Sequence, residues 1–463
     1  MASTTSSPSA SRAAAPGRRS ASQPQLLPAP TRAELAVAFS QALDLAEGHQ
    51  PGHAARICYI ALSLGQALDL PVEEQRTVFY AALLHDAGAS PATAELCRLT
   101  NLGEEAIFRT AAEKSPQQLG MDVAPTNATA IVEALRAHPQ RGADVARSLG
   151  FDDAVQEAIA THHERGDGRG YPKALKAKAI PIAGRIVGAA DLIEALIVGE
   201  GNALAARRNL LAALSEQVGK SLDPDLVHQG RQLARSDGFW LGLYHDELLR
   251  HLGAACPPER RQPSPADLET FASVFADLAD AKGEHTGSHG RRTAELAVQL
   301  ATGLGFSDER RELLRFAALV HDVGLLGVPA RIIAKPDILS LTEMQAMRQH
   351  PTYSEMVIEA LPGLEDVARW VGAHHERPDG KGYPEMEEDD TIPLEGRIIA
   401  LADTYVALTS PRPYRRALSA EDAQQVLLGG AGTQLDTDFV QLFCSLFATP
   451  KSSRTAPRQR QKR

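Results

Sequence analysis

The stretch HHERGDGRGYP at residues 162–172 returns as HHERPDGKGYP at residues 374–384. Each copy begins with two adjacent histidines and lies downstream of a His-Asp pair, His85-Asp86 or His321-Asp322. Imidazole and carboxylate groups gathered in this way are typical ligands of transition-metal ions. The repeated stretch therefore predicts a metal site that occurs twice in one chain.

The repeat extends beyond this motif. His53 and His289, like the His-Asp pairs, are 236 positions apart, whereas the residues from His138 and His350 onwards are 212 apart. The first copy thus holds 24 additional residues, which fall between residues 89 and 137. Ten of the fifteen histidines occupy the paired positions, a concentration that core packing does not explain.

The repeat also sets the expected domain bounds. A Pro- and Arg-rich stretch separates the two copies, as expected of a linker. We predict a disordered tail over 1–30, a first domain over 31–255, a linker over 256–265, a second domain over 266–448 and a basic disordered tail over 449–463.

The hydrophobic pattern within each copy is helical. Leu314, Ala317, Ala318 and His321 recur at helical spacing, and Val78, Ala81, Ala82 and His85 repeat the arrangement. Each His-Asp pair is therefore expected at the end of an inward-facing helical stripe, with Gly88 or Gly324 as the C-cap. We predict an all-α fold of two tandem helical bundle domains.

Composition limits the possible functions. The net charge is −10, and because both tails are basic the body of the chain is more acidic still, which argues against DNA or RNA as a partner. The four cysteines are widely spaced, as in a reduced cytoplasmic protein. No apolar run is long enough to span a membrane, so we expect no membrane partner.

The second copy offers five imidazoles and two carboxylates, more than one ion needs. Mixed nitrogen and oxygen ligation suits Fe, Mn or Zn. An Asp next to a His can bridge two ions, and such a pair activates water and binds phosphoryl oxygens, as phosphodiester hydrolysis requires. The chain shows neither a P-loop nor a GxSxG nucleophile motif.

The order H…HD…H…HH…D, followed by HHERxDGxGYP and ALTSxRPYR, resembles the HD-GYP family of metal-dependent phosphohydrolases. This resemblance covers both copies. It implies an all-α fold, a centre of two divalent ions per intact site (Fe or Mn, with Zn as an alternative) and hydrolysis of cyclic di-GMP to pGpG or GMP. The implied metal ligands are His289, His321, Asp322, His350, His374, His375 and Asp403 in the second copy, and His53, His85, Asp86, His138, His162, His163 and Asp191 in the first.

The resemblance also implies roles beyond metal binding. His321 and Asp322 are the expected catalytic pair. The expected substrate-binding residues are Arg412, Arg415, Tyr383, Gly382 and Lys335. The first copy has Glu200 in place of Arg412 and lacks the KPxxLxxxE stretch around Lys335, so we expect it to be degenerate and the second copy to carry the working site.

Other features leave alternatives open. Ala89 and Leu325 stand where the family usually has a phosphate-binding lysine. One alternative is therefore a weak enzyme that senses cyclic dinucleotides or docks signalling proteins. A second alternative is an enzyme whose substrate is another cyclic dinucleotide or a nucleotide. The GYP loop either approaches a ligand or is a rigid turn. His49 and His285 are either ligands of a third ion or lie outside the centre. The two domains are also expected to pack as an intramolecular pseudo-dimer.

Overall fold

The computed structural model describes residues 30–49, 52–89, 96–97, 100, 127–198, 203–218, 220–259, 264–282, 288–411 and 416–447. In these ranges the chain is helical, with isolated bridges but no strands, which confirms the predicted all-α class. We call residues 30–259 the first half and residues 264–447 the second half; the predicted domain bounds themselves remain a prediction. None of the described helices is both long and apolar enough to cross a membrane.

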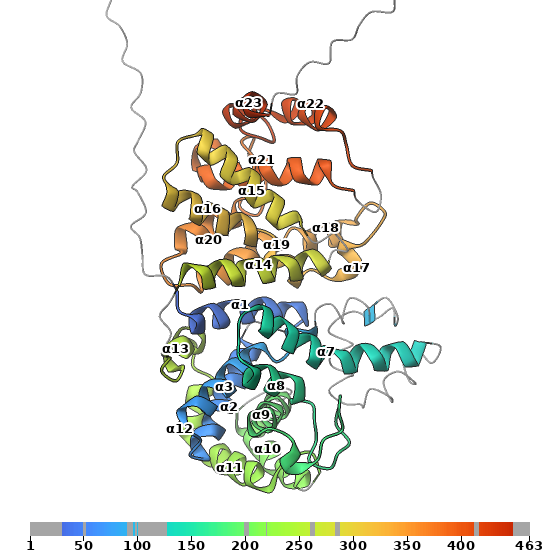
Figure 1. The fold of residues 1–463 in the computed structure, drawn as a ribbon, viewed down its shortest axis with the longest axis vertical. Helices are drawn as coiled ribbons and strands as arrows, with labels where there is room; N and C mark the ends of the chain where they lie inside the picture. The colour runs from blue at the N-terminus through green and yellow to red at the C-terminus, as the bar shows by residue number, and fades with distance from the viewer. Residues whose placement is uncertain are drawn as a thin grey trace, which may run out of the picture.

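The described part of the first half is built from helices. They are α1 (Arg32–Ala46), α2 (His53–Ala67), α3 (Val72–Leu84), α7 (Ala128–Ser148), α8 (Asp153–Thr161), η2 (Ala177–Ala179), α9 (Ile182–Val198), α10 (Ala203–Gln217), α11 (Pro224–Arg235), α12 (Asp237–Leu243) and α13 (Leu248–Ala255). Helix α9 packs on α2, α3, α8 and α10 and forms the centre of this half (Figure 1).

The second half has a matching helix order around its own pair. Its elements are α14 (Pro265–Lys282), α15 (His289–Gly303), α16 (Asp308–Val320), η3 (Val323–Gly327), α17 (Ala330–Ile333), α18 (Leu341–Met347), α19 (His350–Glu359), α20 (Glu365–Gly372), η4 (Asp389–Thr391), α21 (Leu394–Thr409), α22 (Ala420–Gly430) and α23 (Thr437–Leu446). Helices α15 and α16 pack together as α2 and α3 do, and α21 packs on α15 as α9 does on α2.

Local sequence explains why α16 forms and which face it buries. The Ser307 hydroxyl caps the helix by accepting a hydrogen bond from Arg310 N at 3.3 Å, and two acids lie in the first turn. Leu314, Ala317 and Ala318 are fully buried, so the predicted stripe is confirmed. The stripe carries His321 to the protein interior at the end of the helix.

The predicted C-caps were wrong. Helices α3 and α16 end at Leu84 and Val320, before the histidines, and not at Gly88 and Gly324. A Cβ atom at either glycine would instead collide with the carbonyl oxygen of the next predicted histidine ligand, at His138 or His350. Both glycines therefore permit a close approach between the His-Asp turn and the following histidine helix.

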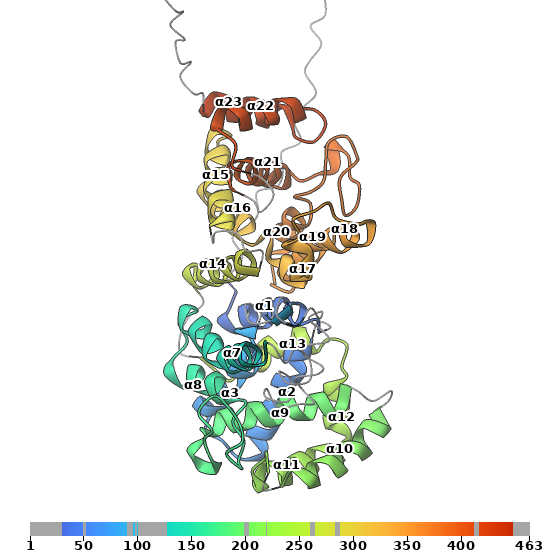
Figure 2. The same cartoon turned by 90° about the vertical axis from the view of Figure 1, so that its right-hand side faces the viewer.

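Helices α1 and α14 lie between the two halves (Figures 1 and 2). Helix α1 packs on α2, α3 and α13 of its own half and on α14, η3 and α19 of the other. The Phe39 ring lies with its centroid 4.4 Å from that of Phe275 and 5.9 Å from that of Phe271. Because all three rings are fully buried, the contact is an apolar core shared by both halves.

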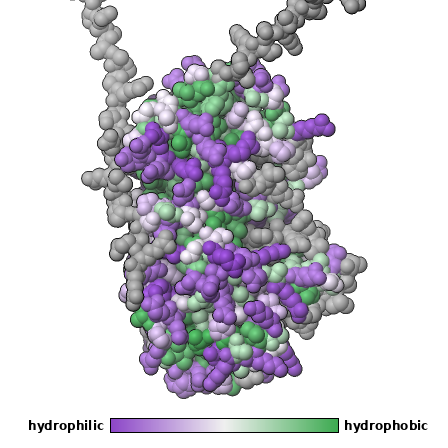
Figure 3. Space-filling model, in the orientation of Figure 1, coloured by the Kyte–Doolittle hydropathy of each residue, from purple (hydrophilic) through white to green (hydrophobic). Residues whose placement is uncertain are grey.

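The surface is polar on the face seen in Figure 3, where hydrophilic residues are spread over both halves. None of the four cysteines forms a disulfide bond in the structure. Buried apolar side chains therefore provide most of the stabilisation.

Candidate metal centres

The second half brings its predicted ligands together around the carboxylate of Asp322. One oxygen, Oδ2, lies 3.3 Å from His321 Nε2 and 3.8 Å from His289 Nε2. The other oxygen, Oδ1, lies 3.3 Å from His350 Nε2 and 3.8 Å from His374 Nε2. Asp322 thus divides four imidazoles into two groups, the arrangement of a carboxylate that bridges two ions.

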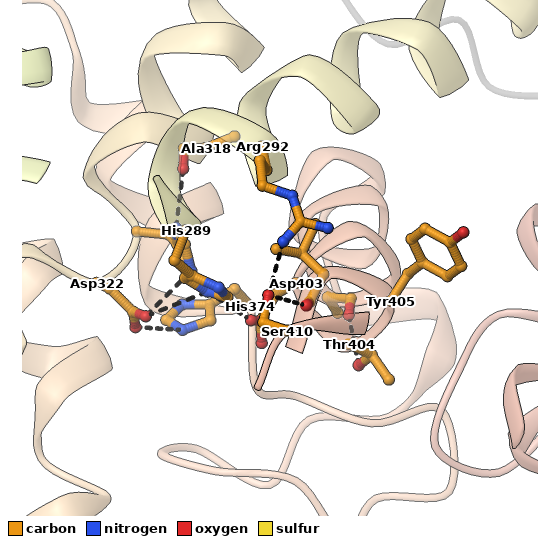
Figure 4. Close-up of polar contacts among 12 residues, drawn as sticks. His289, Arg292, Ala318, Asp322, His374, Asp403, Thr404, Tyr405 and Ser410 are labelled. Atoms are coloured by element: carbon orange, nitrogen blue, oxygen red, sulfur yellow. Dashed lines mark hydrogen bonds and ion pairs between the residues drawn. The ribbon is translucent and has the colours of Figure 1, made fainter. Parts of the chain in front are cut away.

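The remaining two predicted ligands complete these groups. Asp403 Oδ1, from α21, lies 3.0 Å from His289 Nε2 at the start of α15. Ligand atoms of His350, His374 and His375 all lie within 4.8 Å of one another, and so do those of His289, His321 and Asp322. Figure 4 shows how His289, Asp322, His374 and Asp403 meet from separate elements.

The imidazoles are oriented by the backbone. In six of these rings, Nδ1 lies 2.6–2.9 Å from the backbone carbonyl oxygen three residues earlier. Nδ1–H therefore donates to that oxygen, and the Nε2 lone pair is left for an ion. This orientation is shared by His85, His138, His162, His321, His350 and His374.

The inward-facing Nε2 atoms fit bound cations. Nε2 of His350 and Nε2 of His374 lie 3.3 Å apart. Because Nδ1 carries the proton in both rings, both Nε2 atoms are acceptors and cannot hydrogen-bond to each other. The buried Nε2 atom of His321 faces the Asp322 carboxylate at 3.3 Å but makes no hydrogen bond of good geometry. Buried polar atoms without partners are costly, and a cation between such nitrogens and the Asp322 carboxylate would satisfy them.

Burial and neighbouring charge set the protonation of the metal-free centre. Burial disfavours the imidazolium of His321, but the adjacent Asp322 carboxylate outweighs burial and raises the His321 pKa to about 9. Burial opposes ionisation of Asp322 too, yet His321 and His350 hold the pKa of Asp322 well below its usual value. Burial and the neighbouring His375 lower the pKa of His374 far below its usual value, so His374 is neutral, as a ligand must be.

The first half gathers a similar centre around Asp86. Oδ2 of Asp86 lies 3.0 Å from His85 Nε2, and Oδ1 lies 3.5 Å from His138 Nε2 and 3.6 Å from His162 Nε2. His163 has a ligand atom within 4.8 Å of this group. The Nε2 atoms of His85, His138 and His162 are buried and make no hydrogen bond of good geometry, so this half also fits cations.

The first half differs at His53, whose Nδ1 lies 3.0 Å from the carboxylate of Glu194. In the second half, the imidazole of His289 approaches Asp403 through Nε2 instead. Asp191, the predicted ligand equivalent to Asp403, is partly exposed; desolvation raises its pKa, while nearby His85 and His53 oppose the rise. The two halves therefore present different carboxylates to equivalent histidines.

His49 belongs to a further cluster. Its ring stacks on that of His53 at a centroid distance of 4.0 Å, and Glu47, His49 and His53 have ligand atoms within 4.8 Å of one another. A role in binding a third ion remains a prediction. Its counterpart His285 lies outside the described residues.

The GYP loop places its tyrosine against the histidines. The centroid of the Tyr383 ring lies 4.8 Å from that of His375, and the Arg348 guanidinium lies over the Tyr383 ring at 5.2 Å from its centroid. Tyr383 is partly exposed, so contact with a ligand is open to it. Gly382 is buried, and a Cβ there would collide with the backbone of Glu376 and Arg377, which assigns this glycine to the packing of the loop.

Three further residues, Lys335, Arg412 and Arg415, were predicted to bind substrate. Lys335 Nζ lies 2.6 Å from the Glu343 carboxylate, in its own segment. Arg412 and Arg415 lie outside the described residues. Substrate contact by these three residues stays a prediction.

Sequence analysis missed the carboxylates that position the first histidine of each centre. Asp280 Oδ2 accepts a hydrogen bond from the backbone N of His289 at 2.9 Å, and Asp44 accepts hydrogen bonds from the backbone N of Gly52 and Ala54, the residues on either side of His53. The two acids are 236 positions apart, so the repeat offset aligns them, although it does not by itself reveal what they bind.

Comparisons with known proteins agree with this geometry. The family described as HD domain matches residues 116–226 and 273–439. The chain is 32% identical over 431 residues to the 3'3'-cGAMP-specific phosphodiesterase 3 of Vibrio cholerae, covering 88% of this chain and 92% of that protein. It is 33% identical over 171 residues to a cyclic di-GMP phosphodiesterase of Thermotoga maritima, covering 36% of this chain and 46% of that protein.

A solved structure is similar over nearly the whole fold. The crystal structure of the cyclic GMP-AMP-specific phosphodiesterase V-cGAP3 of V. cholerae superposes with a TM-score of 0.65 at 29% identity, covering 90% of this chain and 98% of that one. The two sequence motifs, the two His-Asp centres and these matches together show the family. The chain belongs to the HD-domain family of metal-dependent phosphohydrolases, in its HD-GYP branch of phosphodiesterases.

Proposed function

We propose that this protein is a metal-dependent phosphodiesterase that hydrolyses a cyclic dinucleotide in its second half, and that 3'3'-cGAMP is its substrate. The observation that carries the proposal is the division of four histidines between the two oxygens of Asp322. This arrangement suits a pair of divalent ions, with Fe or Mn as the first expectation and Zn as the alternative.

The chain's own residues would hold and orient these ions. His289, His321 and Asp403 would serve one position, and His350, His374 and His375 the other, with Asp322 between them. When bound, such ions supply an activated water and neutralise the charge on phosphoryl oxygens. The backbone carbonyls that accept from Nδ1 fix the rings before substrate arrives, which keeps the reorganisation cost low.

The second half is the better candidate for turnover. Its segment after α21 carries Arg412 and Arg415, whereas the first half has Glu200 at the position of Arg412. An acid there would repel a dianionic dinucleotide, and a guanidinium would bind its phosphate in a bidentate manner. We propose that the first half is structural or regulatory and packs on the second as an intramolecular pseudo-dimer.

Two kinds of similarity support 3'3'-cGAMP as the substrate. The relative and the solved structure that match nearly the whole chain are both named for cyclic GMP-AMP, whereas the cyclic di-GMP enzyme matches 36% of it. Cyclic di-GMP, which the sequence motif alone implies, is the alternative. We place the protein in the cytoplasm, where cyclic dinucleotides act as signals for further proteins.

A direct comparison of substrates tests the proposal. The Mn- or Fe-loaded protein is incubated with 3'3'-cGAMP and, separately, with cyclic di-GMP, and kcat/KM for linear product is measured for each. We expect a higher value for 3'3'-cGAMP. A higher value for cyclic di-GMP would overturn the substrate assignment, and binding without any product would favour a sensor, as the loss of the family lysine at Leu325 also allows.

A further inference from the structure

Arg292 lies on α15 one turn after the candidate ligand His289, on the same side of the helix. Its guanidinium donates to Ser410 Oγ at 2.7 Å and to Thr409 Oγ1 at 3.1 Å. Figure 4 shows it beside the Asp403 side chain, next to the histidine cluster. Both hydroxyl partners are neutral, and among the residues that the structure describes no carboxylate forms an ion pair with Arg292.

The equivalent arginine of the first half has a different partner. Arg56 lies 236 positions before Arg292, and its Nε and Nη2 lie 2.8 Å and 2.7 Å from Oε1 of Glu194. The Glu194 side chain is only 4% exposed and that of Arg56 is 22% exposed, so this ion pair is partly buried. At the position equivalent to Glu194, 212 residues later, the second half has the buried residue Val406.

The two halves therefore differ in charge at the same place. Glu194 neutralises Arg56, whereas two hydroxyls orient Arg292 and leave its full positive charge beside the centre. A guanidinium has five N–H donors, so one that binds two hydroxyls has donors left for a phosphate. Arg292 is partly exposed, which leaves it accessible to a ligand.

We propose that Arg292 is a further substrate-binding residue, which contacts a phosphate of the cyclic dinucleotide, and that Glu194 abolishes this contact in the first half. The inference rests on the proposed function of the second half. It adds a difference between the halves that does not depend on Arg412 or Arg415.

The simpler explanation is that Arg292 only ties α15 to α21 through the two hydroxyls. Ser410→Ala and Thr409→Val remove that tie and keep the guanidinium, whereas Arg292→Met removes the charge and keeps the aliphatic stem. The tie alone predicts similar losses for all three variants, measured as thermal stability and as KM. Phosphate binding predicts a selective effect of Arg292→Met on KM.

The experiment uses the full-length, metal-loaded protein and 3'3'-cGAMP. We expect Arg292→Met to raise KM by about tenfold to a hundredfold, as for loss of a charge-assisted hydrogen bond, with unchanged metal content. Arg292→Lys should recover part of the loss, and Ser410→Ala should change KM by less than about threefold. An unchanged KM in an active Arg292→Met variant would overturn the inference, and so would equal effects of Ser410→Ala.

A transplanted charge provides a second test. Val406→Glu copies the first half into the second, and Val406→Gln is the matched neutral control of the same shape. The KM should rise for Val406→Glu and much less for Val406→Gln; equal values in folded variants would contradict the charge argument. If the wild-type protein hydrolyses neither dinucleotide, the proposed function fails, whereas an active wild type with unaffected variants rejects only the role of Arg292.

Discussion

Phe39 and Phe275 occupy equivalent positions in the two halves, 236 residues apart, and pack directly against each other with ring centroids 4.4 Å apart. Contact between equivalent residues is the property of a two-fold interface, in which one surface patch meets its own counterpart. Both rings are fully buried. The contact therefore supports the proposed pseudo-dimer of the halves.

This contact predicts a large loss of stability on truncation. Phe39→Ala should lower the free energy of unfolding by about 3–5 kcal/mol, because it leaves a cavity in a closely packed apolar core. The change is measured by urea denaturation. Leu241→Ala is the control, because Leu241 is 74% exposed, and it should cost less than about 0.5 kcal/mol. Equal losses in the two variants would show that the halves do not rely on this contact.

Gly324 predicts a link between packing and metal binding. A Cβ in Gly324→Ala would collide with the His350 carbonyl oxygen, so the His350 helix must shift away from Asp322. We expect this variant to lose metal from the second centre, measured as ions per chain. Gly429→Ala is the control, because nothing lies near a Cβ at Gly429, and it should retain all its metal. Full metal content in Gly324→Ala would refute the link.

The protonation of His321 predicts a pH dependence of metal affinity. Its pKa of about 9 in the metal-free protein means that a cation must displace a proton from His321 at neutral pH. Affinity should therefore rise with pH between 7 and 9, approaching about tenfold per unit for one released proton. Mn titrations at several pH values measure this. His321→Gln should bind weakly and lose the slope, and a pH-independent wild-type affinity would contradict the assignment.

Sequence patterns predicted the parts of the fold that depend on spacing within the chain. The stripe that ends at His321 and the paired ligands came from helical periodicity and from the repeat. Contacts between distant segments were not predictable in this way. The pairing of Glu194 with Arg56 joins residues 138 positions apart, and a glutamate in an apolar helix carries no sign of its partner.

Gly324 shows a second limit. A glycine after a helical stripe suggests a C-cap, but here the backbone of a later helix occupies the space that a side chain would need. The packing of α1 against α14 could not be predicted either, because nothing in one amphipathic helix specifies which distant helix it meets.

The function proposed for the second half depends on Asp322 organising the centre that hydrolyses a cyclic dinucleotide. It is tested most directly by comparing product formation from 3'3'-cGAMP by the wild type, Asp322→Ala and Asp86→Ala, together with the metal content of each. We predict that Asp322→Ala loses at least about a thousandfold in rate, since it removes the residue between both metal positions, whereas Asp86→Ala keeps most activity. Loss of activity in Asp86→Ala, with full activity in Asp322→Ala, would contradict the account.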